Sequence, residues 1–95
     1  MVGIAYLTRR SPSQLGDQLR LAVYAVWEAV TASEVLHLYE HQNIDTVIID
    51  AGAEDPDLPE VQKRYISMLL NENATAADVI WELEQLFPSA VGPIQ

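Results

Sequence analysis

An aspartate at the end of an apolar run is the side chain of this sequence that is best placed for chemistry. Residues 44–51, IDTVIIDA, are mostly apolar, carry Asp50 near their end and are followed by Gly52. This pattern predicts a buried strand with a carboxylate at its C-terminal end. Such a carboxylate can accept a phosphoryl group, pair with a cation, or accept hydrogen bonds from the amides of the next loop.

Two adjacent arginines follow the first apolar run of the chain, residues 2–7. Arg9 and Arg10 stand directly before Ser11, which has the residue type of a helix N-cap. The free amides of a helix N-terminus attract anions, so the two guanidinium groups could complete an anion site there. The alternatives are that both are solvated or that Asp50 pairs with them across the end of the sheet.

The two histidines of the chain, His37 and His41, are four positions apart. This spacing places both imidazoles on one face of a helix, where they can bind one metal ion. No glutamate stands in the position that the zinc motif H-E-x-x-H requires. We therefore expect solvated surface histidines and no metal site.

The absence of cysteine excludes several kinds of chemistry at once. Without thiols there are no disulfides, no thiolate metal ligands and no thiol catalysis. The sequence also has no glycine-rich phosphate loop, and none of its serines has an evident base. We therefore expect neither an enzyme nor a bound cofactor.

Segments with strand character alternate with capped helices, and these elements must position the polar residues. The four strands are expected at residues 2–7, 23–30, 44–51 and 65–70. Capping boxes that begin at Ser11, Thr31 and Thr75 predict three helices, which end near Leu21, Asn43 and Phe87. Between the third and fourth strands, Pro56 and Pro59 permit only a loop with one short turn. In the last helix, the apolar face is expected to hold Ala76, Ile80, Leu83 and Phe87.

This order of elements predicts an α/β fold with an open, mostly parallel sheet of about four strands, in the order 2-1-3-4, and helices on both faces. The C-terminal ends of the first and third strands then meet at the topological switch point, where a ligand site is expected. The 95 residues fit one domain, which we place at residues 1–88. Residues 89–95 are interpreted as a short C-terminal tail.

The charge of the chain limits its partners. At a formal net charge of −9, it would repel nucleic acid and anionic membrane surfaces. The opening apolar run precedes its basic residues, which is the reverse of a signal peptide, and no apolar stretch approaches the ~20 residues of a spanning helix. We therefore expect a cytoplasmic protein with a protein partner.

Three segments resemble the receiver domain of bacterial response regulators: IAYL, VYAVWEAVTASEVLHLYEHQNIDTVIID and TAADVIWELEQLF. The resemblance implies a flavodoxin-like fold and gives Asp50 the position of the phosphoacceptor. Receivers also use an acidic pair after the first strand for Mg²⁺, a hydroxyl residue, and a lysine before the last helix. This chain has Thr8 and Arg9 in place of the acidic pair, and Asn71-Glu72 where lysine-proline is usual.

The resemblance therefore implies a pseudo-receiver, a non-catalytic module for signalling or protein interaction. The alternative is a working receiver that accepts a phosphoryl group on Asp50. One βα unit of a receiver is missing before the last helix, which would leave a sheet edge and an apolar helix face uncovered. We expect homodimerisation to cover them, and Trp27 and Trp81 are candidate interface residues because tryptophan is enriched at interfaces.

Overall fold

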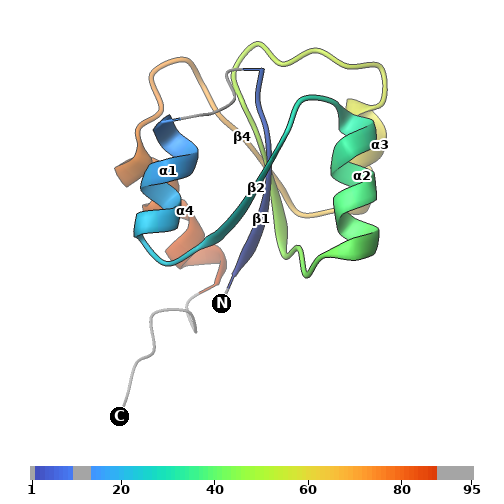
Figure 1. Ribbon diagram of the computed structural model, residues 1–95. Helices are drawn as coiled ribbons and strands as arrows, with labels where there is room; N and C mark the ends of the chain where they lie inside the picture. Colours follow the sequence, from blue (N-terminus) through green and yellow to red (C-terminus); the bar gives the residue numbers. More distant parts are fainter. Residues whose placement is uncertain (1, 10–13, 88–95) are drawn as a thin grey trace.

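The computed structural model describes residues 2–9 and 14–87. It is an α/β fold with an all-parallel sheet in the order β2-β1-β3-β4, which confirms the predicted order and corresponds to a flavodoxin-like arrangement (Figure 1). The strands are β1 (Gly3–Leu7), β2 (Ala25–Ala29), β3 (Thr46–Ile49) and β4 (Ser67–Leu69). The helices are α1 (Gln14–Leu21), α2 (Ala32–His41), α3 (Leu58–Arg64) and α4 (Ala76–Leu86).

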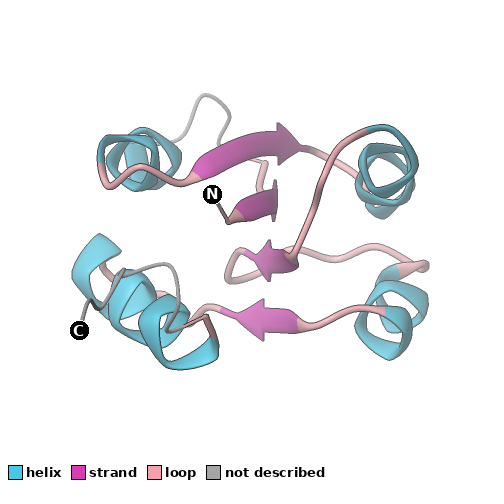
Figure 2. Ribbon diagram, turned by 90° about the horizontal axis from the view of Figure 1, so that it is seen from below, coloured by secondary structure: helices cyan, strands magenta, loops and turns pink. Residues whose placement is uncertain are grey.

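Helices cover both faces of the sheet. Figure 2 shows α1 and α4 together on one side and α2 and α3 on the other. Alternate residues of β1 supply the two cores: Ile4 and Tyr6 pack toward α1 and α4, while Ala5 and Leu7 pack toward α2 and α3. Full burial of a side chain the size of Ile4 or Leu7 contributes about 1.5–3 kcal/mol to folding.

Two of the three predicted capping boxes are present in the structure. The hydroxyl of Thr31 accepts from the amide of Glu34, and the Glu34 carboxylate accepts from the Thr31 amide. Thr75 and Asp78 form the same reciprocal pair at the start of α4. The third box, at Ser11, lies outside the described residues, as do Arg10 and the predicted tail 89–95.

The segment between β3 and β4 is more regular than predicted. It contains α3, a helix of seven residues, where a loop with one short turn is expected. Pro59 falls in the first turn of this helix, where a backbone N–H has no helical partner to lose. Val61 of α3 is completely buried against the α2 layer.

The buried face of α4 also differs from its prediction. The residues that α4 buries completely are Val79 and Leu83. Ala76, Ile80 and Phe87, which were expected on this face, are only partly buried. Ile80 and Phe87 nevertheless pack against the same core as Leu83, so the structure adds Val79 to the predicted face.

Helix α1 ends in a Schellman motif that has valine in place of glycine. The amide of Val23 donates to the Arg20 carbonyl, and the amide of Tyr24 donates to the Leu19 carbonyl. Val23 has φ of 71°, in the left-handed region that L-residues with branched side chains avoid. Because the usual glycine signal is missing, the sequence pattern places the strand two residues too early.

None of the helices in the described part of the chain has both the length and the apolar character needed to span a bilayer.

Candidate functional site

The candidate site lies at the C-terminal ends of β1 and β3, where the strand order reverses. Thr8 follows β1 and Asp50 follows β3, and both side chains are buried. The two strands are paired in register up to Leu7 and Ile49, which brings the next residues side by side. The hydroxyl of Thr8 donates to Oδ2 of Asp50 at 2.8 Å.

Asp50 is held by local hydrogen bonds on both carboxylate oxygens. Oδ1 accepts from the amide of Ala51 at 3.0 Å, while Oδ2 accepts from Thr8. The Asp50 amide donates to the carbonyl of Leu7, which continues the β1–β3 ladder. These hydrogen bonds hold the Asp50 carboxylate in one orientation at the end of the sheet. Only 8% of the residue's surface is exposed to solvent.

A cavity of about 570 Å³ lies beside Asp50. Its wall includes polar side chains from three parts of the fold: Gln14 and Gln18 of α1, Asp50, and Asn71, Glu72 and Thr75 of the segment that leads into α4. The position matches the ligand site that the strand order predicts. Among the described residues of this wall, Asp50 and Glu72 carry carboxylates.

Arg9 turns toward the loop after β3. Its Nη2 donates to the carbonyl oxygen of Glu54 at 2.8 Å, whereas Arg10, the other candidate partner of Asp50, lies outside the described residues. Nearby, Asp55 accepts from the amides of Asp57 and Ala32. These two hydrogen bonds, followed by the charge of Arg9, lower the pKa of Asp55 from its usual 3.8. Asp55 thus joins this loop to the first turn of α2.

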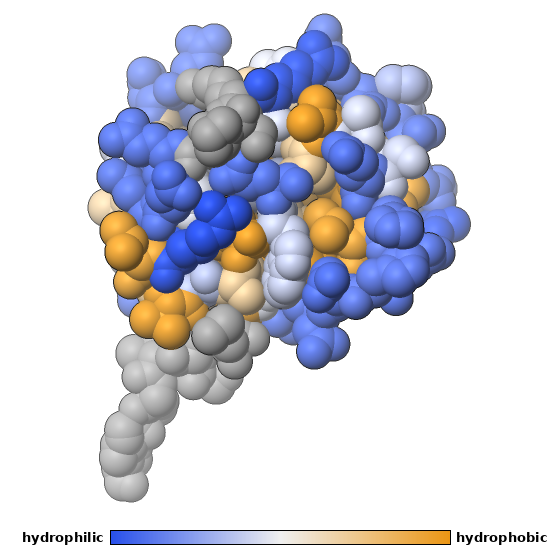
Figure 3. All heavy atoms as spheres, in the orientation of Figure 1, coloured by the Kyte–Doolittle hydropathy of each residue, from blue (hydrophilic) through white to orange (hydrophobic). Residues whose placement is uncertain are grey.

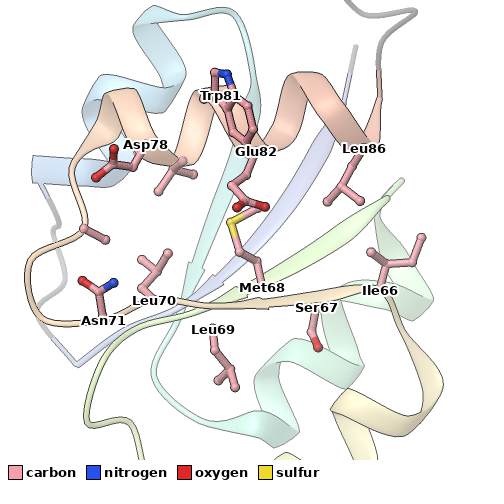
Figure 4. Close-up of a pocket in the computed structure, with 12 residues that line it drawn as sticks. Ile66, Ser67, Met68, Leu69, Leu70, Asn71, Asp78, Trp81, Glu82 and Leu86 are labelled. Atoms are coloured by element: carbon pink, nitrogen blue, oxygen red, sulfur yellow. The ribbon is translucent and has the colours of Figure 1, made fainter.

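A second hollow, of about 580 Å³, lies between β4 and α4. Figure 4 shows Ile66, Met68 and Leu70 on the side of β4 that faces α4, whereas Ser67 and Leu69 point to the opposite side. Large hydrophobic side chains around this hollow are unusually exposed: Ile66 by 54%, Leu69 by 65%, Trp81 by 60% and Leu86 by 44%. We call these four residues the β4 patch.

The two tryptophans have different surroundings. Trp81 belongs to the β4 patch, as its predicted place off the apolar face of α4 suggests. Trp27 is partly buried on β2, with its ring over Gly3: a Cβ at Gly3 would lie 3.4 Å from Cζ3 of the indole. Of the two candidate interface residues, Trp81 is the exposed one.

Another group of apolar side chains lies far from β4. Figure 3 shows hydrophobic residues over the end of α1 and the turn into β2, at the lower left of that view. Leu21 is 84% exposed there, and Val23 is also exposed. We call Leu21 and Val23 the α1 patch. Neither residue lines the hollow between β4 and α4, so the α1 patch provides a comparison for any role of the β4 patch.

His37 and His41 are exposed on α2, on the solvated face that the helical spacing predicts.

Sequence reasoning did not find the Thr8–Asp50 hydrogen bond or the hollow between β4 and α4. Thr8 directly follows an apolar strand, as Asp50 does, and this parallel position was the available signal for the contact. The exposure of the β4 patch depends on how β4 and α4 pack together, which a local sequence pattern does not contain.

No model of a known protein family matches this sequence, and comparisons with curated proteins and with solved structures find no significant match. Function is therefore argued from the residues and surfaces described above.

Proposed function

We propose that this protein is a non-catalytic, receiver-like interaction module that forms a homodimer through the outer edge of β4. The observation that carries the proposal is the β4 patch. Exposed Ile66 and Trp81 lie on one side of the strand edge and exposed Leu69 on the other. Large exposed apolar side chains grouped around one hollow are typical of interaction sites in folded proteins.

The backbone of β4 can accept another strand. Val47 donates to the Ile66 carbonyl, and Leu70 donates to the Ile49 carbonyl, so residues 66, 68 and 70 bond toward β3 in the parallel pattern. The backbone groups of Ser67 and Leu69 consequently point outward. Within the described residues, no strand pairs with this edge.

A second copy of the chain is an occupant with matching geometry. A two-fold axis at Met68 would pair β4 with itself in the antiparallel direction, so that Ser67 of one copy lies opposite Leu69 of the other. Both residues have outward backbone groups, and such a pair exchanges two N–H···O bonds. Each pair also combines one small and one large side chain, which lets Leu69 pack over the neighbouring Ser67. The sheets of the two copies would join into one continuous sheet, and the β4 edge of each copy would be covered.

The surroundings of Asp50 support a non-catalytic role. Thr8 and the Ala51 amide occupy one carboxylate oxygen each. The resemblance to receivers places Mg²⁺-binding acids where this chain has Thr8 and Arg9, and Arg9 extends to the Glu54 carbonyl. Neither Thr8 nor Arg9 therefore supplies a carboxylate that could hold Mg²⁺ beside Asp50.

Light scattering coupled to size-exclusion chromatography tests the dimer, with Leu69→Lys as the disrupting variant. A lysine at the edge places two charges and two flexible side chains in the proposed interface, as natural edge strands do to prevent pairing. Leu21→Lys is the matched control, because it makes the same exchange at a more exposed leucine of the α1 patch. We expect twice the chain mass for the wild type and Leu21→Lys, and a monomer for Leu69→Lys.

Two results would overturn the proposal. One is a wild-type protein that stays monomeric over a wide concentration range. The other is a dimer that survives Leu69→Lys but dissociates in Leu21→Lys, which would move the interface to the α1 patch. Circular dichroism of each variant establishes that the fold is retained, and the high exposure of both leucines makes this the expected result.

A second candidate function is phosphoryl acceptance by Asp50. The observation in its favour is the cavity of about 570 Å³ on which the Asp50 carboxylate borders. Incubation with a small phosphoryl donor and Mg²⁺, followed by intact-mass measurement, separates the two proposals. A gain of one phosphoryl group that Asp50→Asn abolishes would establish the acceptor, whereas no gain, or an equal gain in the variant, supports the non-catalytic module.

A further inference from the structure

Three potential metal ligands meet at the end of α2. His37, Glu40 and His41 each offer a ligand atom, and these atoms all lie within 4.8 Å of one another. We propose that this cluster binds one divalent ion of the late first transition series, with Zn²⁺ as the representative ion. This site is independent of the proposed dimer, since it lies on α2 and not on β4 or α4.

The helix brings the three side chains together. Positions i, i+3 and i+4 share one face of a helix, and His37, Glu40 and His41 have this spacing. The two imidazole rings lie with their centroids 4.2 Å apart and their planes tilted by 32°. Two histidines four positions apart on one helix are the zinc ligands of several metalloprotease motifs. Two ligand atoms on one tetrahedral Zn²⁺ ion lie about 3.4 Å apart, so the exposed side chains rotate to bring their ligand atoms closer when the ion binds.

The hydrogen bond of His41 determines which ring nitrogen is available. Its Nδ1 lies 2.9 Å from the carbonyl oxygen of His37. A carbonyl oxygen can only accept, so Nδ1 carries the proton and donates it, and the lone pair of the neutral ring is on Nε2. Histidine ligands in metal sites almost always donate their other ring N–H to a carbonyl or carboxylate in this way. His41 is therefore already in the tautomer that a metal ligand needs.

The donor set indicates the class of ion. Two imidazole nitrogens and one carboxylate oxygen suit Zn²⁺, Ni²⁺ and Cu²⁺, whereas Mg²⁺ and Ca²⁺ favour sites made of oxygen atoms. Glu40 offsets part of the ionic charge. The last turn of α2 adds the negative end of the helix dipole, which stabilises cations. Three protein ligands leave a coordination position for water.

This inference revises the expectation from the sequence, which is that both histidines are solvated and bind no metal. The H-E-x-x-H motif uses a glutamate directly after the first histidine, and this chain has none there. The structure adds the close approach of the three ligand atoms, that of Glu40 included, and the hydrogen bond that fixes the His41 tautomer. Neither feature is part of the motif on which the expectation was based.

Calorimetric titration of the full chain with Zn²⁺ tests the site. We expect one ion per chain. His37→Asn and His41→Asn should each weaken binding by about tenfold or more, since even the loss of a residue that only supports a ligand costs about tenfold. Glu40→Gln should weaken binding by a smaller factor. Glu84→Gln is the matched control, because it removes an exposed carboxylate from α4 without touching the cluster, and it should bind as the wild type does.

Nuclear magnetic resonance of the wild-type histidine rings gives a second readout that needs no variant. The chain has only two histidines, so their ring signals can be assigned directly, and both should shift together at substoichiometric Zn²⁺. Zn²⁺ that leaves both rings unshifted up to millimolar concentration would overturn the proposal. Binding of equal strength in His37→Asn and His41→Asn would also overturn it, because surface carboxylates would then be the ligands.

Discussion

The hydrogen bond between Thr8 and Asp50 should contribute measurably to stability. Thr8→Val is nearly isosteric, so it removes the hydroxyl without leaving a cavity, and it places a methyl group against Oδ2 of a carboxylate that is 8% exposed. Hydrogen bonds to charged groups are worth about 1.5–3 kcal/mol. We therefore expect Thr8→Val to lower the free energy of unfolding by about 2 kcal/mol, and the melting temperature by about 10 °C for a domain of this size.

The same substitution in an Asp50→Asn background isolates the contribution of the charge. The amide oxygen of the introduced asparagine can keep the bond from Ala51, and its NH₂ group can donate to the Thr8 hydroxyl, which is also an acceptor. The bond is then neutral on both sides and worth about 0.5–1.5 kcal/mol. Thr8→Val should consequently cost about 1 kcal/mol less in this background, and the difference is the coupling energy of the pair.

Urea unfolding of the four proteins, followed by circular dichroism, measures this coupling. Thr8→Ser is the control, because it retains the hydroxyl and should keep most of the stability. The reasoning is refuted if Thr8→Val costs the same in both backgrounds, or if it costs less than about 0.5 kcal/mol in the wild type, since buried hydrogen bonds to carboxylates exceed that value.

Three further predictions concern the backbone and the loop beside the site. Val23→Gly should raise the free energy of unfolding, measured in urea, by roughly 0.5 kcal/mol. Glycine removes the strain of the left-handed φ of 71°, and this gain exceeds the cost of glycine's greater chain entropy and of the lost valine contacts. Gly3→Ala should destabilise it by about 2–3 kcal/mol, since the added Cβ collides with the Asn43 carbonyl. The pKa of Asp55 is lowered in the folded protein, so its carboxylate stabilises the fold above its usual pKa of 3.8. An Asp55→Asn variant should thus be less stable than the wild type at neutral pH, and the difference should vanish as the pH falls below 3.8 through the folded pKa, as acid titration of both proteins will show.

The sheet could be predicted because its signals are local. Residues 44–51 are apolar apart from Thr46 and the acidic residues at either end, and Thr31 and Thr75 carry complete capping boxes. Hydrophobic runs and caps act within a few residues, and handedness rules then leave few topologies. The strand order and the position of Asp50 at the switch point follow from these signals.

The features that were missed depend on long-range contacts or on unusual residues. Val23 adopts a conformation that glycine normally marks, so the turn from α1 into β2 carries no recognisable signal, and the strand was expected to begin at residue 23 instead of 25. Arg9 reaches Glu54, which is 45 positions away in the sequence. Val79 joins the buried face of α4 through its contacts with the core, which the helical pattern did not include. Such choices are made by packing in three dimensions, which a pattern in the sequence does not contain.

Hydrogen exchange at the edge of β4 tests the proposed homodimer most directly. The amides of Met68 and Leu70 face β3 and should be protected at every protein concentration, which makes them an internal control. The amides of Ser67 and Leu69 face outward, and in the dimer they would donate to the second copy. We predict that the protection of both amides rises with protein concentration. In the Leu69→Lys variant, the Ser67 amide should lose this protection. Rapid exchange of both amides in a sample that light scattering shows to be dimeric would contradict pairing through β4.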